Sequence, residues 1–354
     1  SVSKGGSITT KSGTVVQHVR SSTHSVIYLS STAGATATAT IEDLTVTGLD
    51  TYSTSNTAYS GASIFYVTGA GQCTLTVNGG TFTDNEARLL YLIGAGAHQV
   101  NINDCTFSNN PLGYSGAVFA LYNSAESAAE VNFNGGTFTD NSTDTYGGAL
   151  AFDPAFDGIA DNTIENVTFG QAETTTSDDE TTLHGNYAAL RGGAIAFNSN
   201  IKENTLLKCT FTGNTALRYA GAVYYPNTYG KTTEFNPVYT VDGCTFDRNS
   251  ATYDVKNGDD AGGGAILMQV NPTDTPNTVQ VASLYVKNST FTGNTATGCG
   301  GAISTRREAN RGNARIYLNI DNSTFDGNRA TSAGNGGWRG GGAVWVSGYA
   351  WADF

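Results

Sequence analysis

Basic residues are scarce in this chain of 354 residues. Only 18 lysines and arginines stand against 30 aspartates and glutamates, which gives a formal net charge of −12. Non-specific nucleic-acid binding needs a basic surface, so the composition predicts no nucleic-acid partner. No apolar run approaches the ~20 residues that a membrane-spanning helix requires. We therefore expect no membrane span in this segment.

Cysteine and histidine are too few and too scattered to form a recognisable reactive site. The five cysteines are an odd number and do not build a dense disulfide framework. None of them shows the spacing of a metal centre, and the four histidines follow no repeated pattern. We therefore expect no catalytic residue, no cofactor and no metal. The chain begins at Ser1 without a signal peptide, so we also expect a processed product or a fragment.

The residues that are abundant favour strands and turns. Glycine occurs 44 times, and apolar residues make up 39% of the chain, enough for a continuous core. Short β-rich runs alternate with turns of Gly, Asn, Asp and Thr, and no helical periodicity is visible.

A repeated unit organises most of the chain. Its first element is Phe-x-x-Asn, with phenylalanines 25 to 45 residues apart and one copy, at Phe169, that lacks its Asn. The phenylalanines are Phe82, Phe107, Phe138, Phe169, Phe211, Phe246, Phe291 and Phe325. The asparagines are Asn85, Asn110, Asn141, Asn214, Asn249, Asn294 and Asn328. The second element is Gly-Gly-Ala or a relaxed form of it, and it follows at Gly116, Gly147, Gly192, Gly221, Gly263, Gly300 and Gly341.

Short strands at a period of about 30 residues, without helices between them, predict an all-β parallel β-helix of about nine coils. We interpret residues 1–354 as a single domain, with degenerate coils in 1–60, clear repeats in 75–346 and an aromatic tail in 347–354. After this tail we expect the chain to continue or a partner to cap it. A β-sandwich would explain the strand spacing but not the recurrence of the same side chains.

Strand alternation assigns a place to each repeated side chain. The phenylalanines should stack inside the helix, and the asparagines should bond at an inner bend to the backbone or to the asparagine of the next coil. The residue two before each Phe also points inward and is small. Cys209 and Cys244 occupy this position in consecutive coils. They could form a disulfide between the coils, but the favoured interpretation is that they are buried free thiols.

The pairing of Phe-x-x-Asn with Gly-Gly-Ala-Ile resembles the repeat of the polymorphic outer membrane proteins, a family of bacterial surface autotransporters and adhesins. Phe291-Thr292-Gly293-Asn294 with Gly300-Gly301-Ala302-Ile303 is the clearest copy. The resemblance covers roughly residues 75–346, although Arg88-Leu89-Leu90 replaces one Gly-Gly-Ala. It implies a right-handed β-helix outside the cell, used for adhesion or as a structural layer.

Four glycosylation sequons begin at Asn141, Asn166, Asn288 and Asn322. The last three lie three residues before a Phe, an outward position. They would form a column of sugars if the chain is a eukaryotic glycoprotein. Alternatively, Asn-Ser-Thr is a favourable turn-to-strand sequence without a sugar.

Two acidic clusters, Asp178-Asp179-Glu180 and Asp259-Asp260, are the nearest approach to an enzymatic site. Both lie in insertions, where adjacent carboxylates are usually solvated. Ice binding was a further alternative, based on a single column of outward threonines before the phenylalanines.

The insertions 170–186, 250–262 and 329–340 fall between the Phe and Gly-Gly-Ala elements, and recognition often lies on such loops. Aromatics near strand ends are further candidates, although packing is the favoured role for most: Tyr224, Tyr225, Tyr229, Trp338, Trp345 and Trp351.

We predict a non-enzymatic, extracellular or cell-surface structural or adhesive protein. Its expected partners are other copies of itself by end-to-end or lateral contact, as in a fibre or surface layer, other surface proteins, and glycans or a host surface. The alternative is a carbohydrate-active β-helix enzyme, a polysaccharide lyase or hydrolase.

Overall fold

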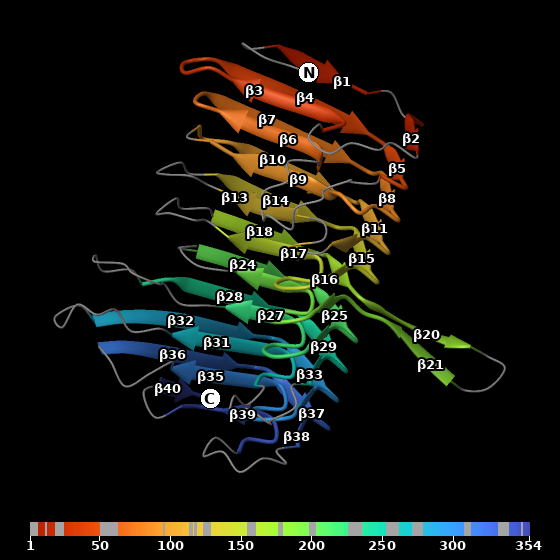
Figure 1. Cartoon of the computed structure of the whole chain (residues 1–354). Helices are drawn as coiled ribbons and strands as arrows, with labels where there is room; N and C mark the ends of the chain where they lie inside the picture. The colour runs from red at the N-terminus through yellow and green to blue at the C-terminus, as the bar shows by residue number, and fades with distance from the viewer. Residues whose placement is uncertain are drawn as a thin grey trace.

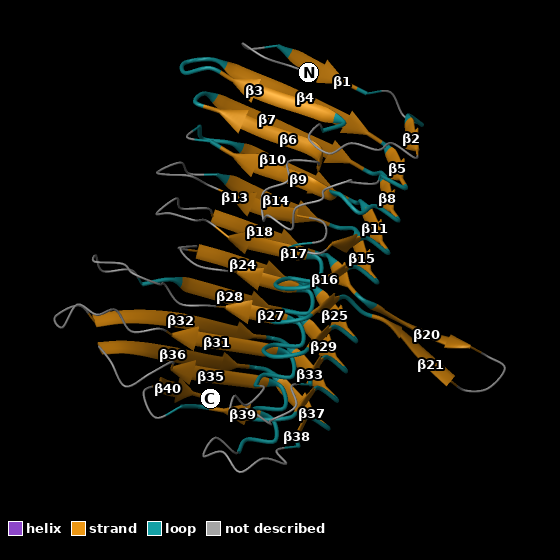
Figure 2. Ribbon diagram, viewed as in Figure 1, coloured by secondary structure: helices purple, strands orange, loops and turns teal. Residues whose placement is uncertain are grey.

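The computed structural model describes residues 6–10, 13–17, 25–49, 63–94, 96–112, 116, 119–122, 129–153, 161–175, 180–197, 203–225, 236–252, 262–270, 279–307, 313–331, 340–347 and 350–354. Within these ranges the secondary structure consists of strands, and no helix is present (Figure 2). The coils stack from the N-terminal to the C-terminal end of the molecule, so that the two ends lie far apart (Figure 1). The all-β parallel β-helix expected from the sequence is confirmed.

Four parallel sheets run along the stack, and each complete coil contributes one strand to most of them. Sheet 1 consists of β1 (Ser7–Thr9), β4 (Thr36–Glu42), β7 (Gln72–Asn78), β10 (Gln99–Asn103), β14 (Glu130–Asn134), β18 (Asp161–Glu165), β24 (Glu203–Leu207), β28 (Val238–Asp242), β32 (Val279–Lys287), β36 (Asn313–Asp321) and β40 (Ala350–Asp353). Sheet 2 consists of β2 (Val15–Gln17), β5 (Thr45–Thr47), β8 (Thr81–Thr83), β11 (Thr106–Ser108), β15 (Thr137–Thr139), β19 (Thr168–Phe169), β25 (Thr210–Thr212), β29 (Thr245–Asp247), β33 (Thr290–Thr292) and β37 (Thr324–Asp326).

The other two sheets complete each coil. Sheet 3 consists of β12 (Pro111–Leu112), β16 (Ser142–Thr143), β22 (Tyr187–Ala188), β26 (Thr215–Ala216), β30 (Ser250–Ala251), β34 (Thr295–Ala296) and β38 (Arg329–Ala330). Sheet 4 consists of β3 (Ile27–Ser31), β6 (Ser63–Gly69), β9 (Arg88–Ile93), β13 (Phe119–Tyr122), β17 (Leu150–Asp153), β23 (Ile195–Phe197), β27 (Val223–Tyr225), β31 (Ile266–Val270), β35 (Ile303–Arg307) and β39 (Val344–Trp345).

The sequence predicts about nine coils. The described strands form ten coils, each with strands in sheets 1, 2 and 4, and β40 begins an eleventh. The additional coil is the first, β1 to β3, which has the strands but none of the Phe, Asn and Gly-Gly-Ala markers. The right-handed sense stays a prediction, in keeping with the rule that parallel crossovers are right-handed.

The repeated phenylalanines lie in one inward column of sheet 2, which begins with Val16 and Val46. Neighbouring rings from Phe82 to Phe325 stack with centroids 4.5 to 5.0 Å apart. Because the strands pair in register, each ring lies directly on the ring of the next coil. A second inward stack, which sequence reasoning did not find, joins Phe152, Phe197, Tyr225 and Tyr239 at 4.5 to 5.1 Å.

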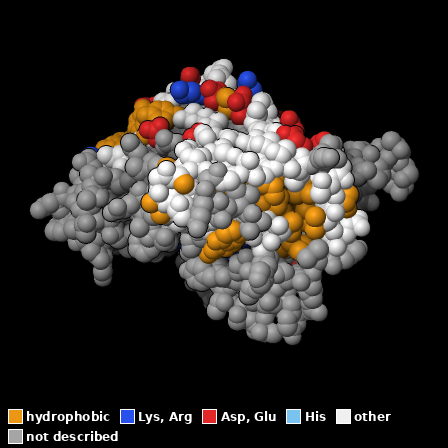
Figure 3. All heavy atoms as spheres, turned by 90° about the horizontal axis from the view of Figure 1, so that it is seen from above, with side chains coloured by type: hydrophobic (Ala, Val, Ile, Leu, Met, Phe, Trp, Pro, Cys, Tyr) orange, Lys and Arg blue, Asp and Glu red, His pale blue; other side chains and the backbone are white. Residues whose placement is uncertain are grey.

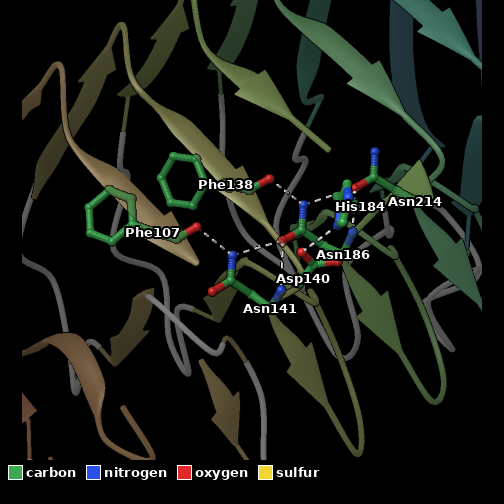
Figure 4. Close-up of polar contacts among 7 residues, drawn as sticks. All are labelled: Phe107, Phe138, Asp140, Asn141, His184, Asn186 and Asn214. Atoms are coloured by element: carbon green, nitrogen blue, oxygen red, sulfur yellow. Dashed lines mark hydrogen bonds and ion pairs between the residues drawn. The ribbon is translucent and has the colours of Figure 1, made fainter. Parts of the chain in front are cut away.

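The repeated asparagines line a buried bend between sheets 2 and 3 and form what we call the asparagine ladder. Each amide nitrogen donates to the side-chain oxygen of the next asparagine, as Asn141 donates to Asn186 at 2.9 Å. The same nitrogen also donates to a backbone carbonyl of the preceding coil, as Asn141 does to Phe107 (Figure 4), and this carbonyl belongs to a repeated Phe except for Asn85, which donates to Val46. The ladder consists of Asn85, Asn110, Asn141, Asn186, Asn214, Asn249, Asn294 and Asn328.

The amide groups of the ladder are fully used. The side-chain oxygen of Asn214 accepts from both the backbone nitrogen and the amide of Asn186. Its own amide nitrogen donates to Phe169 and Asn249. These hydrogen bonds fix the spacing between neighbouring coils. If a coil shifted, a buried amide would lose its partner and could not bond to water instead, which would cost free energy.

Viewed along the rod from the N-terminal end, charged side chains of the described residues gather along one edge, while the near face shows apolar side chains (Figure 3). Ile8 and Val16 of this first coil pack against the core. The interior is therefore apolar from the first coil onward.

One buried titratable group lies between sheets 4 and 1. His98 is 1% exposed, and neither ring nitrogen has a hydrogen-bond partner among the described residues. Burial lowers the pKa of His98 to about 4, because a charged imidazolium would lose its hydration there. The folded protein therefore holds this histidine neutral.

We expect Asn214→Ala to lower the free energy of unfolding by roughly 2–4 kcal/mol, because it removes the buried amide that donates to Phe169 and Asn249 and accepts from Asn186. Urea unfolding followed by circular dichroism measures the change. Asn134→Ala, at an exposed strand end, is the matched control and should stay within about 0.5 kcal/mol of wild type. Equal losses in both variants would contradict a structural role for the ladder.

We expect His98 to weaken the fold as the pH falls from about 6.5 toward 4. Unfolded His98 takes up a proton near its ordinary pKa of 6.5, whereas the folded state resists protonation until about pH 4. The unfolded state binds more protons in this window, so stability falls on acidification. His98→Leu should flatten this part of the profile, measured as the free energy of unfolding at a series of pH values. His184→Gln should retain it, and an unchanged acid-side loss in His98→Leu would refute the assignment.

Candidate functional site

The coil of Phe169 supplies a ladder asparagine that sequence reasoning missed. Asn186 takes the place of the absent Asn and joins Asn141 to Asn214, with bonds of 2.9 Å on each side (Figure 4). The sequence held a signal for it. Five other ladder asparagines are followed by x-Ala: Asn85, Asn214, Asn249, Asn294 and Asn328. The run Asn186-Tyr187-Ala188 follows the same pattern.

Residues 171–184, which we call the arm, are inserted inside this repeat motif. Gly170 lies against Thr212 of the next coil, and Gly185 lies against Gly213, since an added Cβ at either glycine would come within 1.9 Å of the neighbouring carbonyl oxygen. Without the arm, Phe169-Gly170-Gly185-Asn186 reads as an uninterrupted Phe-x-Gly-Asn, like Phe211 to Asn214. The arm therefore enters and leaves the coil without disturbing the ladder.

The arm is an antiparallel hairpin of β20 (Gln171–Thr175) and β21 (Glu180–His184). It projects away from sheet 2 and from the rod (Figure 1). At its base, His184 Nδ1 lies 3.0 Å from the Asp140 carboxylate of the preceding coil (Figure 4). Leu183 lies over Gly213 of the following coil, where an added Cβ would meet the leucine Cβ at 2.8 Å. Contacts with both neighbouring coils thus hold the base of the arm.

Much of the insertion sequence lies outside the described residues. Those residues include Asp178 and Asp179 between the arm strands, Asp259 and Asp260, and the aromatics Tyr229 and Trp338. Within the described ranges, no group of three or more His, Cys, Asp or Glu residues is arranged to hold a metal ion.

The four sequons fall into two structural classes. Asn141 is a buried member of the ladder, so its amide nitrogen is not accessible to a glycan, and the expectation of a glycosylation site there is wrong. Asn166, Asn288 and Asn322 are exposed at turns with positive φ. Asn322 donates to Asn288 at 2.7 Å, and Asn288 donates to Asp242 at 2.8 Å. Glycosylation at these three positions stays a prediction.

All five cysteines are free and buried. Cys209 and Cys244 lie on neighbouring coils, with the backbone nitrogen of Cys209 donating to Cys244 Sγ at 3.4 Å, so the candidate disulfide is absent from the structure. Burial raises the pKa of Cys105 to about 12, which keeps that thiol protonated and unreactive at neutral pH.

The outer face of sheet 2 carries two columns of hydroxyl side chains rather than the single column noted in the sequence. Thr81, Thr106 and Thr137 form part of the first column. The residues two further along each strand, including Thr83 and Ser108, form the second. The arm leaves from this face, so the array is not a continuous flat surface of the kind that ice binding requires.

Tyr224 and Tyr225 are fully buried, which excludes them from partner binding. The Tyr224 hydroxyl accepts from Arg191 and donates to Gln269, each at 3.0 Å. Arg191 also lies 5.5 Å from the ring of Tyr219, which Arg306 covers from 4.9 Å. Together, these hydrogen bonds and cation–π contacts join four coils, and no sequence motif indicated them.

No helix that is long and apolar enough to cross a membrane occurs in the part of the chain that the structure describes. The whole chain matches no curated protein and no solved structure. Residues 288–306 match the Chlamydia polymorphic membrane protein repeat. These residues form β33 and β34 with the following turn into β35, one complete set of Phe, Asn and Gly-Gly-Ala elements. The repeat likeness deduced from the motifs is therefore confirmed: residues 288–306 are a repeat of the polymorphic membrane protein type.

Proposed function

We propose that this chain is a non-enzymatic scaffold at the cell surface and that the arm, residues 171–184, is its adhesive element. The match to a membrane-protein repeat at residues 288–306 supports a surface location. The stack of coils supports a structural role. Backbone hydrogen bonds and the asparagine ladder hold neighbouring coils in fixed positions, so the elements on the outside of the rod keep a fixed orientation.

The observation that carries the proposal is the position of the arm. Ordering the residues of β20 and β21 costs conformational entropy, and a lone two-stranded hairpin adds little stability. The ladder bonds of Asn186 are intact on both sides of the arm, so the ladder does not require it. A projecting element that the scaffold does not need is well suited to contact a partner.

The alternative function, a carbohydrate-active enzyme, needs carboxylates that converge in a groove on consecutive coils. Glu130 and Glu203 lie on the outer face of sheet 1, two coils apart, and both are exposed, and Asp161 of the intervening strand pairs in register with Glu203. Glu130 is engaged with Gln99 and Asn132. Turnover of an acidic polysaccharide by the purified chain would favour the enzyme over the scaffold.

We also propose that copies of the chain contact one another end to end or laterally. Residues 301–354 hold six basic and four acidic residues, whereas the whole chain carries a net charge of −12. Opposite charge at one end favours such contacts, and they should weaken as salt screens them. Sedimentation velocity at low and at high salt tests this contact, and a monomer under both conditions would contradict it.

We expect deletion of residues 171–184 to leave the fold intact and to abolish adhesion. The deletion joins Gly170 to Gly185 and restores the uninterrupted motif, so the free energy of unfolding should change by no more than ~1 kcal/mol. Adhesion is measured as attachment of chain-coated fluorescent beads to cultured epithelial cells. Full attachment by a folded deletion variant would refute the role of the arm, and no attachment by the wild-type chain would refute adhesion itself.

A further inference from the structure

The outer face of sheet 1 changes its chemistry along the rod. Early coils present threonine, asparagine, glutamine and glutamate there, as at Thr74, Gln99 and Glu130. The last coils present aromatic side chains instead. Tyr285 lies on β32, Tyr317 on β36 and Trp351 on β40. We call these three residues the aromatic strip.

The side chains of the aromatic strip are held in fixed positions. The rings of Tyr285 and Tyr317 meet edge to face with centroids 5.9 Å apart. The guanidinium of Arg315 lies 4.8 Å from the Trp351 ring centroid. The Tyr317 hydroxyl donates to Asp353 at 2.6 Å. Because these side chains are already ordered, a ligand that binds them loses less free energy to their conformational entropy.

Trp351 is the exposed member of the strip, at 53%, with Arg315 over its ring, whereas Tyr285 and Tyr317 are half-buried. Val238, 36% exposed, lies in the register column of Tyr317 and Trp351, with Ser283 between it and Tyr317. Cross-strand packing accounts for the Tyr285–Tyr317 contact. Trp351 lies on β40, the last strand of sheet 1, so one side of it has no neighbouring strand among the described residues, while Arg315 holds the ring from the other side. A large aromatic with a fixed, exposed ring is typical of a binding surface.

Polar groups border the rings. Asn319 and Asp353 lie side by side in the register column next to Tyr317 and Trp351. The ammonium of Lys287 lies 5.8 Å from the Tyr285 ring centroid. The three strands of the strip carry two basic residues, Lys287 and Arg315, and two acidic ones, Asp321 and Asp353, so their formal charges cancel. The surface thus combines flat apolar rings, hydrogen-bonding groups and no net charge.

We propose that the aromatic strip binds an extended, neutral polysaccharide chain. The C–H face of a sugar ring is apolar and packs on aromatic rings, while its hydroxyl edge hydrogen-bonds to carboxylate, amide and guanidinium groups. The strip crosses three neighbouring strands, so successive sugar rings can lie along it. Charge balance favours a neutral polymer over an acidic one. This surface lies on a different sheet from the one that carries the arm, and the proposal does not depend on adhesion through the arm.

The test uses the full chain in affinity electrophoresis through gels that contain hydroxyethylcellulose, barley β-glucan, arabinoxylan or galactomannan. We expect at least one polymer to retard the wild-type chain. Trp351→Ala and Tyr317→Ala should each weaken that binding about tenfold or more, which corresponds to ~1.4 kcal/mol. Tyr28→Ala is the matched control and should bind like wild type, since Tyr28 is a 39% exposed, ring-stacked tyrosine on sheet 4.

Three outcomes would overturn the proposal. The first is no retardation of the wild-type chain by any of the four polymers. The second is equal retardation of wild type and Trp351→Ala, both shown by circular dichroism to be folded. The third is self-association that Trp351→Ala abolishes without polysaccharide binding, which would identify the strip as a contact between copies. The arm deletion should keep polysaccharide binding, so failure of the adhesion proposal and failure of this one are distinguishable.

Discussion

The asparagine ladder is the interaction on which the rest of the structure depends. Each amide bonds to a backbone carbonyl of one neighbouring coil and to the asparagine of the other, and these bonds lie out of contact with water. Any shift of one coil would break bonds on both sides and leave polar groups unsatisfied. The phenylalanine stack has a similar period but is non-directional, so it stabilises the stack without fixing its register as strictly.

Because the ladder and the phenylalanines fix the interior, the exterior is free to vary. The arm shows this most directly, since an insertion inside the repeat motif leaves Asn186 in line with its neighbours. Sheet 1 shows it in another way, with a threonine-rich face in early coils and an aromatic strip in the last ones. One scaffold therefore presents two surfaces of different chemistry on different sheets.

Much of the interior followed from the sequence, and the errors have clear physical causes. The Phe column and the inward bend asparagines were visible because their spacing within each coil is constant. Asn186 was missed because an insertion separates it from Phe169, although its Asn-x-Ala context matched. The sequon at Asn141 was misjudged because the motif is defined by three residues, whereas access to its amide depends on the neighbouring coils.

The sequence by itself determined the repeat, the strand alternation and the direction in which the repeated side chains point, because these are local properties of the chain. Only the tertiary structure decided which outward residues become neighbours. Tyr285, Tyr317 and Trp351 lie more than thirty residues apart in sequence, yet they meet on consecutive strands. The cluster of Arg191, Tyr219 and Arg306 arose in the same way. Contacts between coils depend on the length of every intervening turn, and no local pattern encodes those lengths.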